Sequence, residues 1–187
     1  EKPEGLINYL IKNKHYSPFE HGYMTLEIET SKAIGIQLLR HRSFTFQEFS
    51  QRYATITDIE PIELREQHQN NRQSSTNVFN PRIPHYDLES DRFYADNDLL
   101  QPASQAITEF ITMSQNLYKR LLDEGVAREC ARMILPMATS TTIYMTGSIR
   151  SWIHLIDIRS DHHAQKEIQL ISEEMRTIFI NELPIIS

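Results

Sequence analysis

Arginine, histidine and serine side chains gather between residues 40 and 52. The sequence reads Arg40-His41-Arg42, with Ser50 and Arg52 following after a short interval. An arginine buried without a partner is costly to desolvate, so these guanidinium groups either face water or bind an anion. Several anion-binding groups in so short a stretch favour a site for an extended, multiply charged ligand.

Two predicted elements must position this stretch. Residues 23–29 alternate apolar and polar side chains, as a half-buried strand does. Thr30 or Ser31 can then cap a helix whose last turn contains residues 40–42, and its predicted inward positions are Ile34, Leu38 and Leu39. Consecutive helical residues fan out by about 100°, so all three basic side chains reach one ligand only if the helix ends among them. In the simpler alternative, the basic side chains bind no ligand and are present only because the helix dipole favours cations in the last turn.

Residues beyond the basic triplet extend the predicted site. Ser50 and Arg52 lie two positions apart, so in an extended segment they share a face, with Glu48 beside them.

Four segments in order resemble the flavin-dependent thymidylate synthases. The first three are residues 15–21 (His-Tyr-Ser-Pro-Phe-Glu-His), the basic triplet with Ser50 and Arg52, and residues 128–136 (Arg-Glu-Cys-Ala-Arg-Met-Ile-Leu-Pro). The fourth runs from Gly147 through Arg150 and Arg159 to His163-Ala164-Gln165. Because the segments keep the family order along most of the chain, the resemblance is specific.

The resemblance implies methylation of dUMP to dTMP, with 5,10-methylenetetrahydrofolate as carbon donor and FADH2, regenerated by NADPH, as hydride donor. It assigns catalysis to Arg159, without an enzyme nucleophile on uracil. The implied FAD contacts are Ser17, Arg40, His41, Arg42, Glu48, Ser148, Ile149, Arg150 and His154. The implied substrate contacts are Gln37, Leu38, Leu39, Arg40, Glu48, Phe49, Ser50, Gln51, Arg52, Arg132 and Arg159. The family often has asparagine where Ser148 and His154 stand, and both can still form hydrogen bonds.

The same resemblance implies an α+β fold, with a twisted, mainly antiparallel sheet, packed helices and a homotetramer with shared active sites. Residue Ser17 would contact flavin from a neighbouring subunit. At 187 residues the chain is expected to form a single domain over residues 1–187, lacking an N-terminal strand of the family.

Composition narrows the function classes. The formal net charge of −6 argues against bulk nucleic-acid or membrane-surface binding, so the arginines must act locally. One cysteine, Cys130, excludes an internal disulfide and fits a reducing compartment. No apolar run of about 18 residues is present and the first residues do not resemble a signal peptide, so a cytoplasmic protein is expected.

The available side chains favour electrostatic catalysis over nucleophilic catalysis. The five glycines form no phosphate-binding loop, so arginine side chains and helix ends must hold phosphates. Cys130 is predicted to be a small buried hydrophobe, and Ser50 to bond the nucleotide, because no base accompanies either. A fixed guanidinium near uracil favours the ring's N3-deprotonated form, the role that the resemblance gives to Arg159.

The remaining sequence predicts further elements. Helices are expected over residues 5–14, from Pro102 to Gly125, and over 128–136, and strands over 54–59 and 139–146. Residues 65–75 and 77–96 are predicted to be long loops around a short Phe93-Tyr94 element. They are expected to act as a lid or subunit contact, with solvated loops as the alternative.

Two helices are predicted at the end of the chain. The first begins after Gly147-Ser148 and carries Arg150 and His154 opposite a buried stripe formed by Ile149, Trp152, Ile153 and Ile156. The second is capped by Asp161, and its predicted buried stripe is Ala164, Ile168, Ile171, Met175 and Ile178.

Two other functions compete with the enzyme. A single-stranded nucleic-acid-binding module would stack bases on Phe44, Phe46, Phe49 and Tyr53 beside the arginines. A metal hydrolase would use His15, His21, His162 and His163, although their spacing matches no common ligand set, and no metal is expected. His15 and His21 fit a loop held by local hydrogen bonds as well as a cofactor contact.

Overall fold

The computed structural model describes residues 3–52, 58–87, 92–93 and 100–185. The chain forms two compact units. The first, here called the sheet unit, comprises Glu1–Phe49 and Thr141–Ser187, and the second, the insert unit, comprises Ser50–Ser140. Each unit is described by itself.

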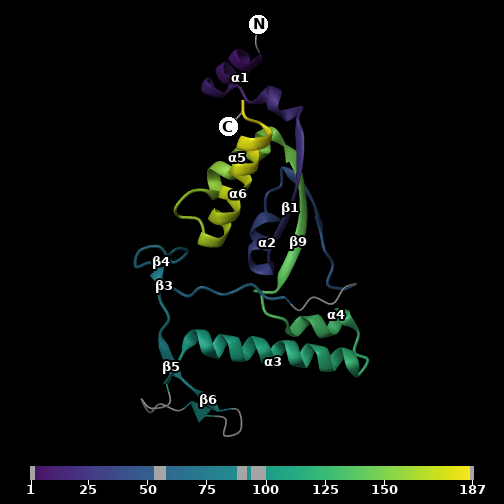
Figure 1. The fold of residues 1–187 in the computed structure, drawn as a ribbon, viewed down its shortest axis with the longest axis vertical. Coiled ribbons are helices and arrows are strands. Elements are labelled where there is room, and N and C mark those ends of the chain that lie inside the picture. The colour runs from purple at the N-terminus through teal and green to yellow at the C-terminus, as the bar shows by residue number, and fades with distance from the viewer. Residues whose placement is uncertain (1–2, 53–57, 88–91, 94–99, 186–187) are drawn as a thin grey trace. The chain divides into compact units, whose positions relative to one another are not determined.

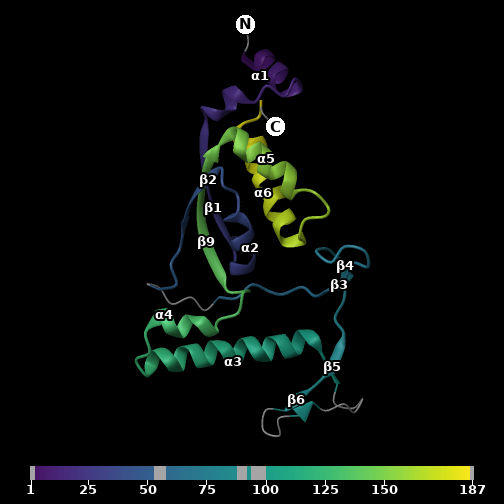
Figure 2. The same ribbon diagram turned by 180° about the vertical axis from the view of Figure 1, so that it is seen from behind.

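The sheet unit is built on three strands, β1 (Tyr23–Ser31), β2 (Phe44–Glu48) and β9 (Ser140–Ser148). Their order is β1-β9-β2, and Figure 2 shows β9 between the other two. β2 pairs antiparallel with β9, from Phe44 opposite Gly147 to Glu48 opposite Ile143. On the other side of β9, the hydroxyls of Thr25 and Thr146 lie 2.8 Å apart. The predicted alternation in β1 is confirmed over residues 24–29, where the apolar side chains are partly or fully buried and the polar ones are exposed.

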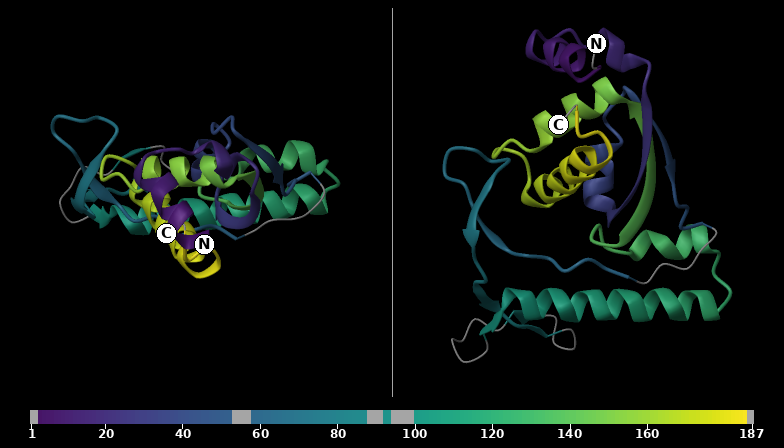
Figure 3. Two further views of the ribbon diagram at one scale, coloured as in Figure 1. Left: turned by 90° about the horizontal axis from the view of Figure 1, so that it is seen from above. Right: turned by 45° about the horizontal axis from the view of Figure 1, so that its top comes forward.

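Three helices lie along one face of this sheet (Figure 1): α2 (Lys32–Leu38), α5 (Ile149–Arg159) and α6 (Lys166–Glu182). The helix α1 (Pro3–Lys12) and the 3-10 helix η1 (Ser17–Glu20) lie at one end of the strands (Figure 1). α5 and α6 pack against each other (Figure 3). The core contains Trp152, whose ring centroid lies 4.7 Å from that of Phe44 and whose Nε1 donates to the Met24 carbonyl at 3.1 Å. Gly35 lets α2 approach β9, because a Cβ there would lie 3.0 Å from Ile143.

The insert unit combines short strand pairs with a long helix (Figure 1). β3 (Arg65–Gln67) pairs with β4 (Ser75–Val78), β5 (Arg82–Pro84) with β8 (Leu100–Pro102), and β6 (Tyr86–Asp87) with β7 (Arg92–Phe93), all antiparallel. The helices are α3 (Ala103–Asp123), α4 (Arg128–Ala131) and the 3-10 helix η3 (Arg132–Ile134). Gly125, at φ 83°, ends α3 as predicted, because this left-handed conformation favours glycine.

The α+β class and the antiparallel pairing are confirmed. Most predicted helices occur with shifted ends, and the 128–136 helix divides into α4 and η3. The homotetramer and the single domain stay predictions. Among the described residues, no helix is both long and apolar enough to cross a membrane.

The prediction of loops over residues 65–75 and 77–96 is partly wrong, because both ranges contain short strands. Polar residues 65–78 form the β3–β4 hairpin, which contains few apolar side chains. Its turn is closed by side chains: His68 Nδ1 accepts the main-chain N–H groups of Asn70 and Asn71, at 3.1 Å each. These local hydrogen bonds stabilise the hairpin in place of a buried apolar face. The sequence therefore has no hydrophobic periodicity from which the two strands could be predicted. Residues 54–57 of the predicted 54–59 strand and Tyr94 lie outside the described residues, and Ile59 forms an isolated bridge with Thr139.

Three side-chain predictions for the helices are wrong. Leu39 is not inward but 37% exposed, because α2 ends one residue earlier. Gln165, not Asp161, precedes α6, since residues 160–165 form a separate connection. The core of α6 uses Phe179, while Ile178 is 38% exposed.

Candidate functional site

The basic triplet lies in the loop between α2 and β2. α2 ends at Leu38, and the main-chain N–H of His41 donates to the Leu38 carbonyl at 3.0 Å. The prediction that the triplet occupies the last helical turn is therefore wrong. Arg40 and Arg42 are exposed and form no ion pair among the described residues, whereas His41 is half-buried. The loop directs the three side chains more freely than a helix would.

Arg159, the last residue of α5, contacts this loop and α2. Its Nε donates to His41 Nε2 at 3.0 Å, and its Nη2 donates to the Gln37 carbonyl at 3.3 Å. Burial, followed by the nearby charge of Arg40, lowers the pKa of Arg159 below its usual value. The fold thus brings together predicted substrate and flavin residues from distant parts of the sequence.

His41 is held in a cationic environment. Burial is the main cause that lowers its pKa, followed by the charges of Arg159 and His154. The ring meets Phe44 edge-on, with centroids 6.3 Å apart. His41 is therefore favoured as a neutral imidazole that accepts the Arg159 hydrogen bond.

A second group surrounds a pocket of about 470 Å³ in the sheet unit. It includes three predicted flavin residues, Ser148, Arg150 and His154. Ser148 is buried, caps α5 by accepting the Ser151 N–H at 3.3 Å, and donates to Glu20 at 3.0 Å. Hydrogen bonds from Arg150 and then Ser148 hold the pKa of Glu20 below its usual value.

Sequence reasoning missed several residues of this pocket: Tyr16, Glu20, Tyr23, Ser43, Ser151, Ile153 and Asp157. Glu20 lies inside the quoted 15–21 segment but received no role. Asp157 could have been found, because it follows Arg150 and His154 at helical spacing on α5.

Glu48 is fixed by two donors. Its Oε1 accepts from Lys32 Nζ at 2.7 Å and from Thr141 Oγ1 at 2.9 Å. Both side chains of the ion pair are partly buried. Lys32 therefore helps to hold Glu48, a predicted ligand contact, in place.

Some predicted contact residues can offer little besides main-chain atoms. Leu38 is 0% and Ile149 7% exposed, because both belong to the core. Leu39 and Phe49 are exposed. Ser17 is exposed in η1 and does not line the pocket of Ser148 and Arg150.

The insert unit assembles a separate arginine group. Arg52 Nη2 lies 3.3 Å from Glu129 Oε2, and Arg132 Nε donates to the Glu129 carbonyl at 3.4 Å. The Arg52 ion pair is exposed and therefore contributes little stability, which leaves its guanidinium available to a stronger anion. Sequence analysis gave Glu129 no role, because the two arginines that it contacts belong to motifs that are far apart in the sequence.

The chain turns at Gln51 and Arg52, so Ser50 and Arg52 do not lie in the extended segment in which they would share a face. The Arg52 N–H donates to Ser50 Oγ at 3.3 Å. Gln51 is 7% exposed, and its Nε2 has no hydrogen-bond partner among the described residues. A buried amide donor of this kind can satisfy itself on a ligand oxygen.

Cys130 is exposed, so the prediction of a buried hydrophobe is wrong. It lies in the four-residue helix α4, where a short helix leaves one side open to solvent. No base among the described residues contacts it.

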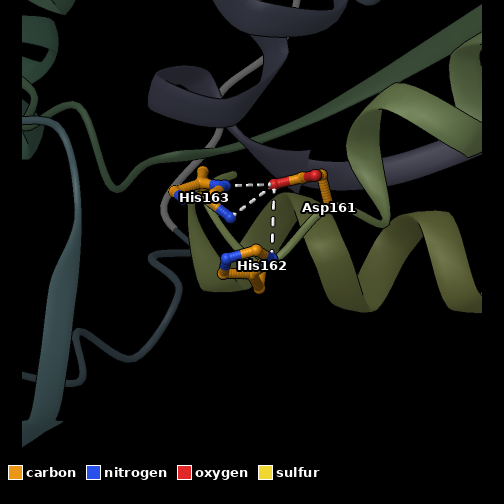
Figure 4. A group of neighbouring side chains, drawn as sticks. All are labelled: Asp161, His162 and His163. Carbon is orange, nitrogen blue, oxygen red and sulfur yellow. Dashed lines mark hydrogen bonds and ion pairs between the residues drawn. The ribbon is translucent and has the colours of Figure 1, made fainter.

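Histidines also gather at the connection between α5 and α6. Figure 4 shows His162 and His163 beside Asp161, whose Oδ1 accepts the His163 main-chain N–H at 2.8 Å and lies 2.7 Å from His163 Nδ1. These bonds lower the pKa of Asp161 and close the turn. All three residues are exposed, and among the described residues His15 and His21 do not join them in a cluster of potential ligands.

The stacking surface of the nucleic-acid alternative is not formed. Phe44 is 8% exposed in the core and Phe46 packs against it, so neither presents a free face. Phe49 is exposed, and Tyr53 lies outside the described residues.

Comparisons with known proteins agree over the length of the chain. The family profile described as "Thymidylate synthase complementing protein" matches residues 1–185. The probable flavin-dependent thymidylate synthase of Paramecium bursaria Chlorella virus 1 is 42% identical over 189 residues, covering 98% of this chain and 78% of that protein. The flavin-dependent thymidylate synthase of Synechocystis sp. is 42% identical over 182 residues, covering 97% and 77%.

A solved structure is similar too. The UMP/dUMP methylase PolB from Streptomyces cacaoi, bound with 5-Br UMP, superposes with a TM-score of 0.76 at 27% identity. The match covers 98% of this chain and 79% of PolB. Since the profile and the relatives match almost the whole sequence, the chain belongs to the thymidylate synthase complementing protein family, the flavin-dependent thymidylate synthases.

Proposed function

We propose that this protein methylates the uracil C5 of dUMP to give dTMP. The carbon donor is 5,10-methylenetetrahydrofolate, and the hydride donor is reduced FAD, which NADPH regenerates. Family membership, the names of the relatives and the methylase identity of PolB support this reaction. The observation that carries it is the fixed, half-buried Arg159 guanidinium.

Arg159 is suited to activate the uracil. His41 and Gln37 hold its Nε and Nη2, while Nη1 has no partner among the described residues. A guanidinium in a partly desolvated position stabilises negative charge that develops on a nearby ring more than one in water does. We infer that its open edge contacts the uracil and favours N3 deprotonation, which makes C5 electron-rich enough to attack carbon.

The chain needs no covalent nucleophile in this proposal. Ser50 Oγ already accepts the Arg52 N–H, and Cys130 is exposed without a base. A thiol or hydroxyl without an activating base is a weak nucleophile at neutral pH. Arg52 and Arg132 instead offer cationic groups for the nucleotide phosphate, in competition with Glu129.

The residues around the 470 Å³ pocket fit a flavin nucleotide. Arg150 and His154 line the pocket, and Arg40 and Arg42 expose further guanidinium groups that suit a pyrophosphate. Reduced FAD would supply the hydride when bound. The role of the protein is to bind it through these groups and to orient it toward the nucleotide.

We also propose a homotetramer with shared sites and a cytoplasmic location. The exposed side chains Phe110, Met113 and Leu117 on α3 support association, because contiguous apolar groups on a helix commonly mark an interface. Ser17, exposed and outside the pocket of its own chain, is suited to contact a neighbour's flavin.

The proposal is tested by spectroscopy and assay together. The purified protein should bind FAD with a perturbed visible spectrum and form dTMP from dUMP, methylenetetrahydrofolate and NADPH. Arg159→Ala should abolish dTMP formation, whereas the control Arg72→Ala, which removes an exposed arginine of the insert unit, should not. A protein that neither binds FAD nor forms dTMP would exclude the function, and normal turnover by Arg159→Ala would exclude this mechanism.

A further inference from the structure

We propose that His41 is a positioning residue that aims the Arg159 guanidinium at the substrate by accepting its Nε–H as a neutral imidazole. The inference rests on the proposed function and goes beyond it, because the resemblance gives His41 only a flavin contact. The direct support is the 3.0 Å bond from Arg159 Nε to His41 Nε2, between residues 118 positions apart in sequence.

The direction of this bond fixes the tautomer of His41. Arginine stays protonated in proteins and has no acceptor, so its Nε must donate. His41 Nε2 must then carry a lone pair, and the single ring proton resides on Nδ1. A protonated His41 could not accept the bond and would place a second cation against Arg159.

The surroundings keep His41 neutral. Arg159 and His154 approach it from α5, and Arg40 precedes it in the loop. No described carboxylate forms an ion pair with His41. Desolvation and positive charge act in the same direction and lower its pKa, so the acceptor persists through neutral pH.

A second hydrogen bond of Arg159 fixes the orientation of its guanidinium group. The Gln37 carbonyl accepts from Arg159 Nη2 at 3.3 Å, at the end of α2. Two acceptors on different atoms of a planar guanidinium fix its plane as well as its position. Without the His41 acceptor, the Arg159 guanidinium could rotate about its remaining hydrogen bond to Gln37. A small misplacement of a catalytic group lowers the reaction rate strongly.

Two substitutions of His41 distinguish its role as a hydrogen-bond acceptor for Arg159 from its role as a flavin contact. His41→Gln retains a side-chain acceptor but cannot be protonated, whereas His41→Leu retains bulk without an acceptor. His162→Leu is the matched control, because His162 is an exposed histidine outside the proposed sites. Circular dichroism first establishes that each variant folds.

The kinetic experiment measures kcat and KM for dUMP across pH, with FAD saturating. We expect His41→Leu to lower kcat roughly 100-fold, as expected for a misaligned catalytic group, with a smaller change in KM. We expect His41→Gln to recover at least a tenth of the wild-type kcat and to lack the wild-type fall in rate on the acid side. Equal losses in both variants that follow their FAD affinities would overturn the inference, because His41 would then act only as a flavin contact.

Two measurements do not depend on turnover. Carbon-13 chemical shifts of labelled histidine should show the Nδ1–H tautomer at His41 in the wild type. The ultraviolet difference spectrum of bound dUMP should report less N3 ionisation in His41→Leu than in the wild type. An Nε2–H tautomer would overturn the inference even in an active enzyme, whereas the expected tautomer and spectral difference would support it even if dTMP were not the product.

Discussion

Arg150, in the first turn of α5, forms an ion pair with Glu20 in η1, with Nη1 2.5 Å from Oε1. The same carboxylate accepts from the buried Ser148 hydroxyl, which caps α5. Glu20 thereby connects the cap of the helix that carries Arg159 with a side chain proposed to bind flavin.

Removing the Glu20 charge should change the pH dependence of stability. Its pKa is lowered from the usual value of 4.5, so its contribution is present above that pH and is lost as pH falls through the lower folded pKa. Glu20→Gln should therefore be less stable than the wild type at neutral pH, and the difference should shrink in acid. Urea midpoints measured from neutral to acidic pH test this.

The control for this prediction is Glu4→Gln, which removes an exposed carboxylate of α1 that forms no ion pair among the described residues. It makes the same charge change without removing an ion pair. A wild-type and Glu20→Gln difference that is flat with pH would contradict the Glu20 ion pair.

Gly147→Ala should destabilise the sheet unit. A Cβ at Gly147 would lie 2.5 Å from Cε1 of Phe44, which faces it across the β2–β9 pair. Shifting this core ring should lower the unfolding free energy by about 1–3 kcal/mol, as overpacking does. Chemical denaturation followed by circular dichroism gives the value.

Gly5→Ala is the matched substitution. Gly5 lies in α1, and nothing lies within 4 Å of the added Cβ. It should raise the unfolding free energy by about 0.5–1 kcal/mol through helix propensity. Equal effects of the two substitutions would contradict the close packing of Gly147 on Phe44.

Tyr118→Phe should be tolerated despite complete burial. Tyr118 is 0% exposed in α3, and its hydroxyl has no partner among the described residues. Removing an unsatisfied buried hydroxyl should raise the unfolding free energy by about 1 kcal/mol. A thermal-denaturation series with Tyr9→Phe, an exposed tyrosine of α1, as control tests this, and a loss of stability in Tyr118→Phe would show that the hydroxyl is bonded.

Ser50→Ala should weaken dUMP binding but leave measurable turnover. The change removes the acceptor of the Arg52 N–H and the hydroxyl proposed to contact the nucleotide. We expect about a tenfold rise in the dUMP dissociation constant, the effect of losing about one hydrogen bond. Calorimetric titration measures it, with Ser75→Ala in the exposed β4 as control. Complete loss of activity with unchanged affinity would instead make Ser50 a participant in the chemistry.

The sequence alone determined the elements that depend on local pattern. Period-two alternation predicted β1, and the apolar stripe from Ile149 to Ile156 predicted the buried side of α5, because burial follows the repeat of each element. The order of the short motifs also indicates the family, because it needs no knowledge of the fold. The pattern did not determine the ends and caps of helices, as Asp161 and Leu39 show, because several nearby residues can end a helix.

Only the tertiary structure decided which distant groups meet. Nothing local in the sequence indicates that Arg159 donates to His41, that Glu20 pairs with Arg150, or that Glu129 contacts both Arg52 and Arg132. The exposure of Cys130 likewise depends on what packs against a four-residue helix. Hydrogen bonds and burial depend on atoms brought together by packing, and such packing is a property of the whole fold, not of any single segment.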